Sequence, residues 1–425
     1  MIRIYEFNTV ADCDVFNRAQ DTFNVEEIVT EIIETVKSQK DAALLAYTEK
    51  FDQVVLNSLQ VSEEEITEAF QGADPEFIRV MRDSAANIEA YHKNQLRGGF
   101  EIKKQDGIVL GQKITPLAKV GIYVPGGTAA YPSTVLMNSI PAKLAGVKEI
   151  VMVTPPSRDG RVNPAILCAA KIAGVDKIFK IGGAQAIAAL AFGTESVPCV
   201  DKIVGPGNAF VAEAKRLVYG KVAIDMIAGP SEILVLADGK SDPAFVAADL
   251  LSQAEHDKMA SAVLVTDSAD LANQVQSEIE TQLITLPREQ IARASIDNFG
   301  KIIVCADLMQ GIEVANRIAP EHLEICVDNP FDYLDKIENA GSVFLGRYCP
   351  EALGDYYAGT NHTLPTSGTA RFSSPLSVDD FIKKISYTYY DQNAIQKAAP
   401  DIALFARKEG LDAHARSAEI RLKHE

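Results

Sequence analysis

The stretch VGIYVPGG (Val120–Gly127) is an apolar, β-branched run that ends in a proline and two glycines. Similar runs recur downstream, separated by alanine-rich stretches with helical spacing. The predicted strands are Val120–Val124, Glu149–Val153, Lys177–Ile181, Val200–Val204 and Val222–Met226, and the predicted helices are Thr134–Ala145, Ala165–Ala173, Ala184–Ala191 and Ala209–Val218. Strands that alternate with helices of about ten residues are typical of βαβ units, and unbroken apolar runs indicate a parallel sheet covered by helices on both faces.

A second, looser alternation of strands and helices follows. The predicted strands are Ile233–Leu236, Ala262–Val265, Lys301–Val304, His322–Val327 and Ser342–Leu345, and the helices are Phe245–Glu255, Leu271–Ile279 and Leu308–Arg317. Val25–Val36, Ile66–Phe70 and Phe77–Ile88 have helical periodicity instead, and Ser62 followed by Glu65 predicts a helix start with a capping box. We therefore predict an α/β fold with two Rossmann-like parallel-sheet domains and small helical segments at the two ends.

The composition limits the classes of protein to consider. The chain has 425 residues, with 58 acidic side chains against 41 Lys and Arg and a formal net charge of −17. This length suits two or three domains, and the acidity argues against binding to nucleic acid or to an anionic membrane. The amino-terminal residues lack the basic and apolar regions of a secretory signal, and the six cysteines include no C-x-x-C pair. We expect a cytoplasmic protein with reduced thiols.

Glycine-rich turns follow three predicted strands of the first sheet. They are Pro125–Gly127, Gly182–Gln185 and Gly205–Asn208. Ligands of open parallel sheets bind outside the carboxyl ends of the strands, where glycines permit the close approach of a phosphate. The sequence has no G-x-G-x-x-G fingerprint, so the pattern alone fits either a nucleotide or phosphate site or ordinary tight turns.

Four of the six histidines stand in polar clusters. Gln253 and His256 share a face if their segment is helical. They are then either metal ligands or a polar pair on the surface. Glu321 and His322 are residue types suited to acid–base catalysis, although an exposed Glu–His pair is more often solvated surface. The remaining clusters are Gly354–Pro365, predicted as a functional loop that carries Asp355 and His362, and the tail residues Glu409 and His414.

Taken together, these segments resemble the histidinol dehydrogenase family along nearly the whole chain. The segments that carry the resemblance are Gly121–Gly127, Ser133–Met137, Gly182–Ala188, Gly205–Phe210, Ala228–Glu232, Ser252–His256, Pro320–Leu323, Ala340–Gly346, Gly354–Tyr356 and Gly359–His362. The resemblance implies an aldehyde-dehydrogenase-like architecture and a zinc-containing, NAD-dependent dehydrogenase. Such an enzyme oxidises L-histidinol through L-histidinaldehyde to L-histidine, the last step of histidine biosynthesis.

The resemblance also implies a role for each matching residue. The catalytic pair is Glu321 and His322. The zinc ligands are Gln253, His256, Asp355 and His414, the NAD contacts are Tyr123, Gln185 and Asn208, and the substrate contacts are Ser231, His362, Glu409, His322 and the four zinc ligands. Oxygen and nitrogen donors of this kind suit Zn²⁺ or a similar divalent ion.

The resemblance implies a domain layout and a partner. Residues 1–20 are an amino-terminal arm, residues 21–119 join residues 232–372 in a first α/β domain with the metal and catalytic residues, and residues 120–231 are the Rossmann-like NAD-binding domain. Residues 373–425 are a helical tail that crosses to the partner subunit of a homodimer, so that two chains build each active site.

The expected mechanism uses one zinc ion per subunit to bind the imidazole and amine nitrogens of histidinol. His322 accepts the hydroxyl proton, and Glu321 activates the water that hydrates the aldehyde. The alternative is an aldehyde-dehydrogenase-like oxidoreductase with a thiol nucleophile. Cys326 is near the catalytic pair, but its segment is predicted as a buried strand, which favours the hydrate route. A nucleotide-binding scaffold without turnover is less compatible with an intact Glu321 and His322.

Overall fold

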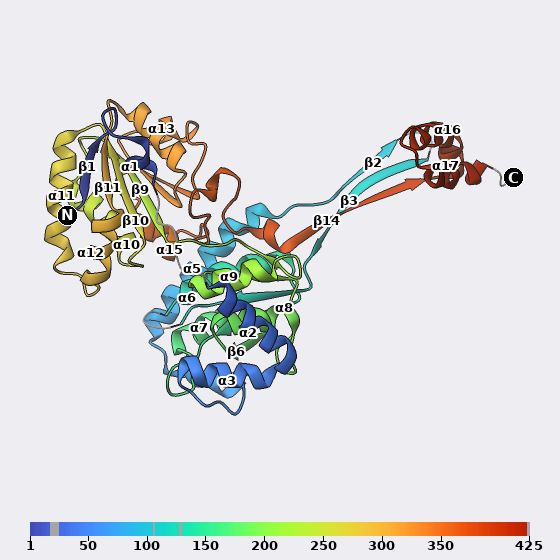
Figure 1. The fold of residues 1–425 in the computed structure, drawn as a ribbon, viewed down its shortest axis with the longest axis horizontal. Coiled ribbons are helices and arrows are strands. Elements are labelled where there is room, and N and C mark those ends of the chain that lie inside the picture. The colour runs from blue at the N-terminus through green and yellow to red at the C-terminus, as the bar shows by residue number, and fades with distance from the viewer. Residues whose placement is uncertain (18–24, 105–106, 127–129, 423–425) are drawn as a thin grey trace. The chain divides into compact units, whose positions relative to one another are not determined.

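The structure is a computed structural model that describes residues 1–17, 25–104, 107–126 and 130–422. The chain divides into two compact units (Figure 1). The first unit comprises Met1–Gln95 and Ala118–Phe381, and the second comprises Leu96–Leu117 and Ile382–Glu425. Residues 18–20 of the expected arm, Gly127 of the first glycine turn and residues 423–425 of the tail lie outside the described residues.

The segment that begins with the glycine-rich run forms, in its described residues, a parallel five-stranded sheet. Its strands are β4 (Lys119–Tyr123), β5 (Glu149–Thr154), β6 (Lys177–Lys180), β7 (Lys202–Val204) and β8 (Ala223–Ile224), in the order β6-β5-β4-β7-β8. The connecting helices are α6 (Pro132–Ala145), α7 (Pro164–Ala173), α8 (Gly183–Phe192) and α9 (Ala209–Val218). The prediction of a parallel sheet is confirmed, although β7 and β8 are shorter than predicted.

The second alternation forms a parallel six-stranded sheet in the order β1-β11-β10-β9-β12-β13, counted over the described residues. The strands are β1 (Arg3–Glu6), β9 (Glu232–Ala237), β10 (Ser261–Thr266), β11 (Lys301–Val304), β12 (His322–Cys326) and β13 (Ser342–Leu345). Helices α10 (Pro243–Ala254), α11 (Ala269–Leu283) and α12 (Glu289–Phe299) pack on one face, and α1 (Asp12–Phe16) and α13 (Leu308–Ile318) on the other (Figure 1). The sequence did not predict β1, because this edge strand is too short and too exposed to give an apolar run.

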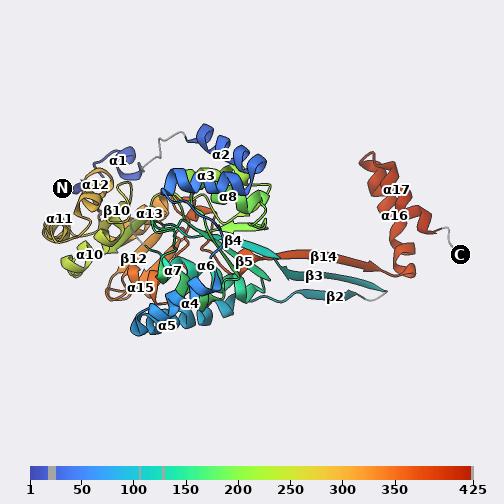
Figure 2. The same ribbon diagram turned by 90° about the horizontal axis from the view of Figure 1, so that it is seen from below.

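The amino-terminal helices pack differently from the expected grouping of residues 21–119 with residues 232–372. They are α2 (Glu26–Gln39), α3 (Asp41–Asp52), α4 (Glu63–Gly72) and α5 (Pro75–His92), and the capping box of Ser62 and Glu65 is confirmed at the start of α4. The buried side chains of α2 share one core with α8 of the five-stranded sheet (Figure 2). Because Ala184–Leu190 of α8 are buried on every face, that helix needs a cover on the side away from its sheet.

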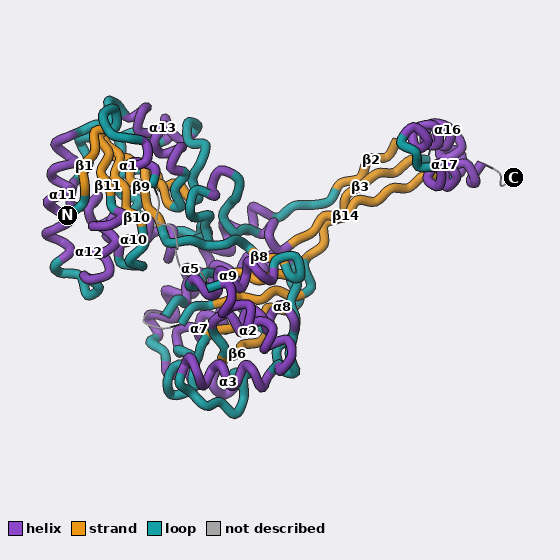
Figure 3. The backbone as a smooth tube through the Cα atoms, in the orientation of Figure 1, coloured by secondary structure: helices purple, strands orange, loops and turns teal. Residues whose placement is uncertain are grey.

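The second unit contains an antiparallel sheet of β2 (Phe100–Lys104), β3 (Ile108–Pro116) and β14 (Ile382–Tyr390), followed by α16 (Gln392–Lys408) and α17 (Asp412–Glu419) (Figure 3). The helical prediction for residues 373–425 is therefore wrong over β14, whose Ile, Thr and Tyr residues favour strands. Its partner β3 is distant in sequence, with Ile382 opposite Pro116. No described helix is long and apolar enough to span a membrane.

Candidate active site

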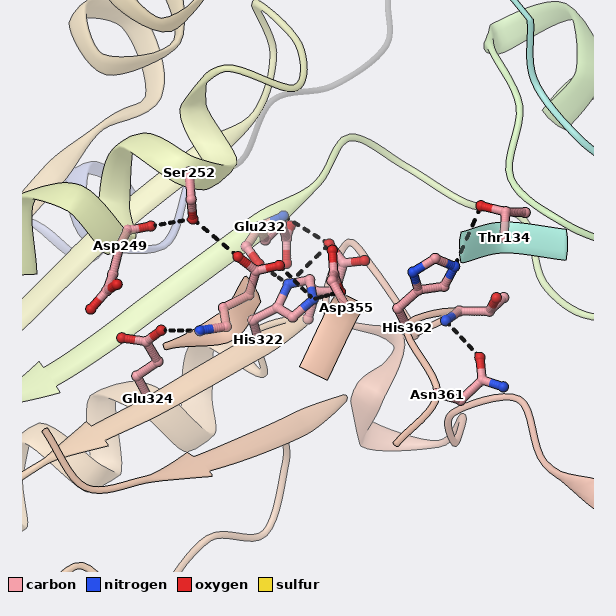
Figure 4. A network of polar contacts seen from close by, with 12 residues as sticks. Thr134, Glu232, Asp249, Ser252, His322, Glu324, Asp355, Asn361 and His362 are labelled. Carbon is pink, nitrogen blue, oxygen red and sulfur yellow. Dashed lines mark hydrogen bonds and ion pairs between the residues drawn. The ribbon is translucent and has the colours of Figure 1, made fainter. Parts of the chain in front are cut away.

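The backbone of one residue, Glu232, holds the two expected catalytic side chains. The N–H of Glu232 donates a hydrogen bond to Oε2 of Glu321 (2.9 Å), and the carbonyl of Glu232 accepts one from Nδ1 of His322 (2.9 Å; Figure 4). Glu232 starts β9 and His322 starts β12, and the two strands are neighbours with His322 opposite Ile233. A carbonyl oxygen can only accept, so Nδ1 carries a proton and Nε2 is the nitrogen available for chemistry.

Three carboxylates surround the imidazole of His322. Nδ1 lies 3.7 Å from Oε2 of Glu321, and Nε2 lies 3.8 Å from Oδ1 of Asp355 and 4.0 Å from Oε1 of Glu351. Burial alone would lower the pKa of His322, but these carboxylates raise it to about 10. Burial raises the pKa of Glu321 to about 8. The opposing effects leave a buried site that is rich in negative charge.

Asp355 lies in the short helix α15 (Glu351–Tyr356), so the predicted loop of residues 354–365 is wrong over its first residues. The helix starts at Glu351, upstream of the polar segment on which the loop prediction was based. Burial opposes ionisation of Asp355, yet the hydrogen bond and charge of His322 hold its pKa below the usual range. The helix places Glu351 and Asp355 one turn apart, and both reach His322.

The carboxylates and their neighbours include a donor set that fits a divalent cation. Ligand atoms of His322, Glu351 and Asp355 all lie within 4.8 Å of one another. Gln253, in the last turn of α10, is 1% exposed, and neither polar atom of its amide has a hydrogen-bond partner among the described residues. A buried amide without a partner is costly, and coordination of a cation by its oxygen is one way to satisfy it.

His256 lies close enough to this group to interact with the charges of Asp355 and His322. Its backbone N–H donates to the carbonyl of Gln253 (3.1 Å), which continues the helical turn beyond α10. Burial lowers the pKa of His256, and the charge of Asp355 is the main effect that opposes this shift. The neutral imidazole is the form that binds a metal. His256 thus interacts with Asp355 and follows Gln253 by one helical turn, all within the first unit.

Four polar residues that the sequence analysis did not single out support this site. The hydroxyl of Ser252 lies within hydrogen-bond distance of Glu351 (3.0 Å) and of the carbonyl of Asp249 (2.8 Å), and Glu324 accepts a hydrogen bond from the N–H of Glu351 (2.7 Å). Burial and the charge of Asp249 raise the pKa of Glu324 well above its usual value. A carboxylate within the apolar run Leu323–Val327 was the signal in the sequence that could have revealed Glu324.

His362 and Ser231 lie at the margin of this cluster. The ring Nε2 of His362 is 3.4 Å from the hydroxyl of Thr134 in α6, and burial lowers the pKa of the imidazole (Figure 4). The preceding Asn361 donates to the carbonyl of Met137 in the same helix (2.7 Å), which fixes the segment that carries His362. Ser231 directly precedes Glu232 and is half-buried.

The expected cofactor residues lie at the carboxyl edge of the five-stranded sheet. The chain proceeds from β4 to β5 on one side, whereas β7 and β8 lie on the other, so the switch point lies between β4 and β7. Tyr123 ends β4, and its hydroxyl accepts a hydrogen bond from the N–H of Gly183 (3.1 Å). Burial raises the pKa of Tyr123 to about 12. Gln185 is buried in the first turn of α8, and Asn208 caps α9 through a bond from the N–H of Val211 (3.2 Å).

Two expected site residues belong to the second unit. Glu409 is the carboxyl-terminal cap of α16, and His414 lies in the first turn of α17. Both side chains are exposed in this unit. Their roles as substrate contact and metal ligand stay predictions.

The described cysteine side chains belong to free thiols, and none is placed as a nucleophile. Cys326 is the nearest in sequence to the catalytic pair, lies in β12 and is 5% exposed. Burial raises its pKa strongly, and the carboxylate of Glu324 adds to this effect. An activated thiol needs the opposite shift.

A comparison with known sequences gives consistent matches. A family model described as histidinol dehydrogenase matches residues 16–422. A histidinol dehydrogenase from Streptococcus mutans is 59% identical over 403 residues, covering 95% of this chain and 94% of that protein. One from Clostridium acetobutylicum is 57% identical over 392 residues, covering 92% and 91% of the two chains.

Solved structures show the same relationship at the level of the fold. The crystal structure of a histidinol dehydrogenase from Elizabethkingia anophelis matches with a TM-score of 0.94 and 43% identity, covering 99% of this chain and 98% of that one. A betaine aldehyde dehydrogenase from Staphylococcus aureus matches with a TM-score of 0.50 and 9% identity, covering 85% and 88%. The second likeness concerns the fold alone, and it agrees with the predicted aldehyde-dehydrogenase-like architecture.

Proposed function

The chain belongs to the histidinol dehydrogenase family, and from this premise we propose that it oxidises L-histidinol through L-histidinaldehyde to L-histidine. It is an NAD-dependent oxidoreductase that acts on a CH–OH group. Oxidation of an alcohol to an acid removes four electrons, so two molecules of NAD⁺ each accept one hydride. The observation that carries the proposal is the backbone of Glu232, whose N–H and carbonyl hold a carboxyl group and an imidazole side by side in one buried site.

His322 is the proposed base for both hydride transfers. Its Nδ1–H is committed to the carbonyl of Glu232, so Nε2 is free to accept the proton of the substrate hydroxyl. The pKa of His322 is high because carboxylates face it. If Asp355 held a cation, part of that negative charge would be offset and the pKa of His322 would fall toward the range of a general base.

Glu321 is the proposed base for the water that attacks the aldehyde. Burial raises the pKa of its carboxyl group to about 8, so the carboxylate form of Glu321 is a stronger base than an exposed carboxylate and can accept a proton from water during the attack. The hydrogen bond from Glu232 fixes one oxygen of the group and leaves the other for water. The hydrate then presents a hydroxyl group to His322, and the second oxidation repeats the first.

We assign Gln253, His256, Asp355 and His414 as ligands of one divalent ion per subunit, which we propose to be zinc. The unpartnered amide of Gln253 supports its part in this assignment, and the cluster of His322, Glu351 and Asp355 supports a cation beside Asp355. When bound, the ion supplies a template for the imidazole and amine nitrogens of histidinol. Ser231, His362 and Glu409 complete the proposed substrate contacts, and the hydrogen bond of Asn361 to α6 holds His362 in place.

We propose that NAD⁺ binds at the switch point between β4 and β7, where Tyr123, Gln185 and Asn208 lie. The glycine turns there lead into the amino termini of α8 and α9, and helix amino termini favour an anionic ligand, which the acidic chain could not attract by its overall charge. The cytoplasmic location expected from the sequence stays a prediction.

We further propose a homodimer in which the second unit supplies His414 to the site of the partner. The buried side chains of its helices are all small: Ala394, Ala399, Ala403, Ala406, Ala415 and Ala418. Large apolar side chains remain outside, with Phe405 70%, Leu404 61% and Ile420 58% exposed. A unit with so small a core needs another surface to cover these side chains, and a second copy of the chain is the proposed cover.

Replacing Phe405 with aspartate is expected to dissociate the dimer and to reduce histidinol oxidation in parallel. The aspartate places a charge on an apolar surface that the partner covers, and a separated chain lacks the partner's copy of His414. Light scattering after size-exclusion chromatography measures the mass, and the assay is run at the same protein concentrations. Ile284→Asp is the matched control, because Ile284 is equally exposed (69%) in the first unit. A monomeric Phe405→Asp variant with full activity would contradict shared active sites.

The Cys326→Ser variant is expected to keep most of the parental activity and to form two molecules of NADH per histidinol. The thiol is buried, and its raised pKa makes it a poor nucleophile. NADH absorbance and chromatography of the amino-acid product measure both oxidations in the parent and the variant. A folded Cys326→Ser protein that stops at the aldehyde would support the thiol mechanism instead. A parent that forms neither NADH nor histidine would contradict the proposed function itself.

A further inference from the structure

A buried ion pair lies beneath one of the glycine turns. Lys215 of α9 is 2% exposed and pairs with Asp225, which is 1% exposed and follows β8. Nζ of Lys215 donates to the carbonyl of Gly205 (3.0 Å), and Oδ2 of Asp225 accepts from the N–H of the same residue (2.7 Å). The ion pair thus binds both polar groups of Gly205, the first residue of the Gly205–Asn208 turn.

Gly205 has a backbone conformation that needs such support. Its φ angle of +113° is accessible to glycine and strained for other residues, and a Cβ atom would lie 2.1 Å from the carbonyl oxygen of Tyr123. The turn is therefore packed directly against the end of β4. Asn208, which caps α9, lies three residues further on, so the orientation of Gly205 sets where the helix begins.

The ion pair is not explained by stability alone. Desolvation of two charges costs several kcal/mol, and well-packed apolar side chains often replace such pairs without loss. Lys215 cannot act as a direct phosphate ligand either, because it is buried and its charge is already paired with Asp225. The pair provides two charge-assisted hydrogen bonds to Gly205, one to its N–H and one to its carbonyl.

We propose that Lys215 and Asp225 are positioning residues for NAD⁺, acting through the peptide groups of Gly205. Their hydrogen bonds hold the Gly205–Asn208 turn in the one conformation that accepts the dinucleotide. Loss of the pair therefore weakens NAD⁺ binding and leaves the proton transfers at His322 unchanged. The inference rests on the proposed function, which places NAD⁺ at this turn.

The test uses the Lys215→Met/Asp225→Asn double variant of the full-length enzyme. The double variant leaves no unpaired buried charge. The asparagine that replaces Asp225 keeps an oxygen that can accept from the N–H of Gly205. The methionine that replaces Lys215 removes the donor to the carbonyl of Gly205. We expect the KM for NAD⁺ and the dissociation constant of NADH, measured by fluorescence, to rise about tenfold, because a hydrogen bond from a charged group is lost. The kcat at saturating NAD⁺ stays within about threefold of the parent, since the turn does not touch His322.

Lys202→Met is the matched control. Lys202 starts the same strand that Gly205 follows, is 10% exposed and pairs with Asp380 at 2.8 Å, but it lies at the opposite end of the sheet. We expect this variant to lower the melting temperature and to keep the KM for NAD⁺. An unchanged NADH affinity in the folded double variant overturns the inference, as does an equal loss in Lys202→Met. Failure of the parent to bind NADH overturns the proposed cofactor site as well, so the two failures are distinguishable.

Discussion

Replacement of His322 with alanine is expected to lower kcat for histidinol oxidation about a thousandfold, the usual scale for loss of a positioned general base. The carbonyl of Glu232 keeps a proton on Nδ1 of this imidazole, which leaves Nε2, on the side of Asp355 and Glu351, to accept the substrate proton. Both oxidations pass a proton to it, so the alcohol and the aldehyde should be affected together. NADH formation from each substrate measures the two rates.

His92→Gln is the control for the cost of losing a buried histidine. His92 is fully buried, and its Nδ1 bonds to Gln95 at 2.7 Å, but it does not contact Glu321 or His322. This variant should lose stability rather than kcat. If His322→Ala retained a rate within about tenfold of the parent, another group would have to serve as the base.

Removal of the divalent ion by a chelator is expected to abolish turnover, and addition of Zn²⁺ to restore it. Without the ion, the substrate loses the template that holds its carbinol carbon in place, and such positioning can contribute about 7–11 kcal/mol. Metal analysis measures the zinc content of the protein before and after treatment, and the NADH assay measures its turnover. A chelated and verified metal-free enzyme that oxidised histidinol at full speed would exclude the proposed role.

A variant can test the ligand assignment without reference to turnover. Gln253→Leu should bind less than one equivalent of zinc in equilibrium dialysis, because the buried amide oxygen is lost. The variant should not be less stable than the parent in the metal-free state, since this amide has no hydrogen-bond partner among the described residues. Gln276→Leu is the control, because the amide of Gln276 bonds instead to the carbonyl of Ile2 (2.7 Å). A full zinc equivalent in Gln253→Leu would exclude Gln253 as a ligand.

The sequence predicts those helices and strands whose pattern of apolar residues matches their burial in the structure. The five-stranded sheet and its alanine-rich helices were predictable because Val120–Val124 and its counterparts are buried on both faces. The three strands of the second unit were not, because most of their side chains are exposed and their pairing joins distant segments. Periodicity likewise identifies α2 as a helix, yet it cannot tell which sheet that helix covers.

The candidate site shows the same division. The spacing of Gln253 and His256 sufficed to place both on one helical turn, and Asp355 joins them in space although it is distant in sequence. Glu351 could not be predicted, because nothing in its sequence context distinguishes it from the many surface glutamates. Its importance depends on burial and on its hydrogen bonds with Ser252 and Glu324, which only the three-dimensional arrangement creates.

The use of both the N–H and the carbonyl of Glu232 as anchors has a consequence for substitutions at this position. Because backbone groups make both hydrogen bonds, a side-chain substitution at this position removes the buried carboxylate that contributes to the raised pKa of Glu321 but removes neither anchor. Proline is the exception, since it has no N–H to offer Glu321 and would release one group while retaining the other. Glu321 and His322 are consecutive at the start of β12, whereas both anchors belong to β9, so a sliding movement of β9 along β12 would remove the two hydrogen bonds together.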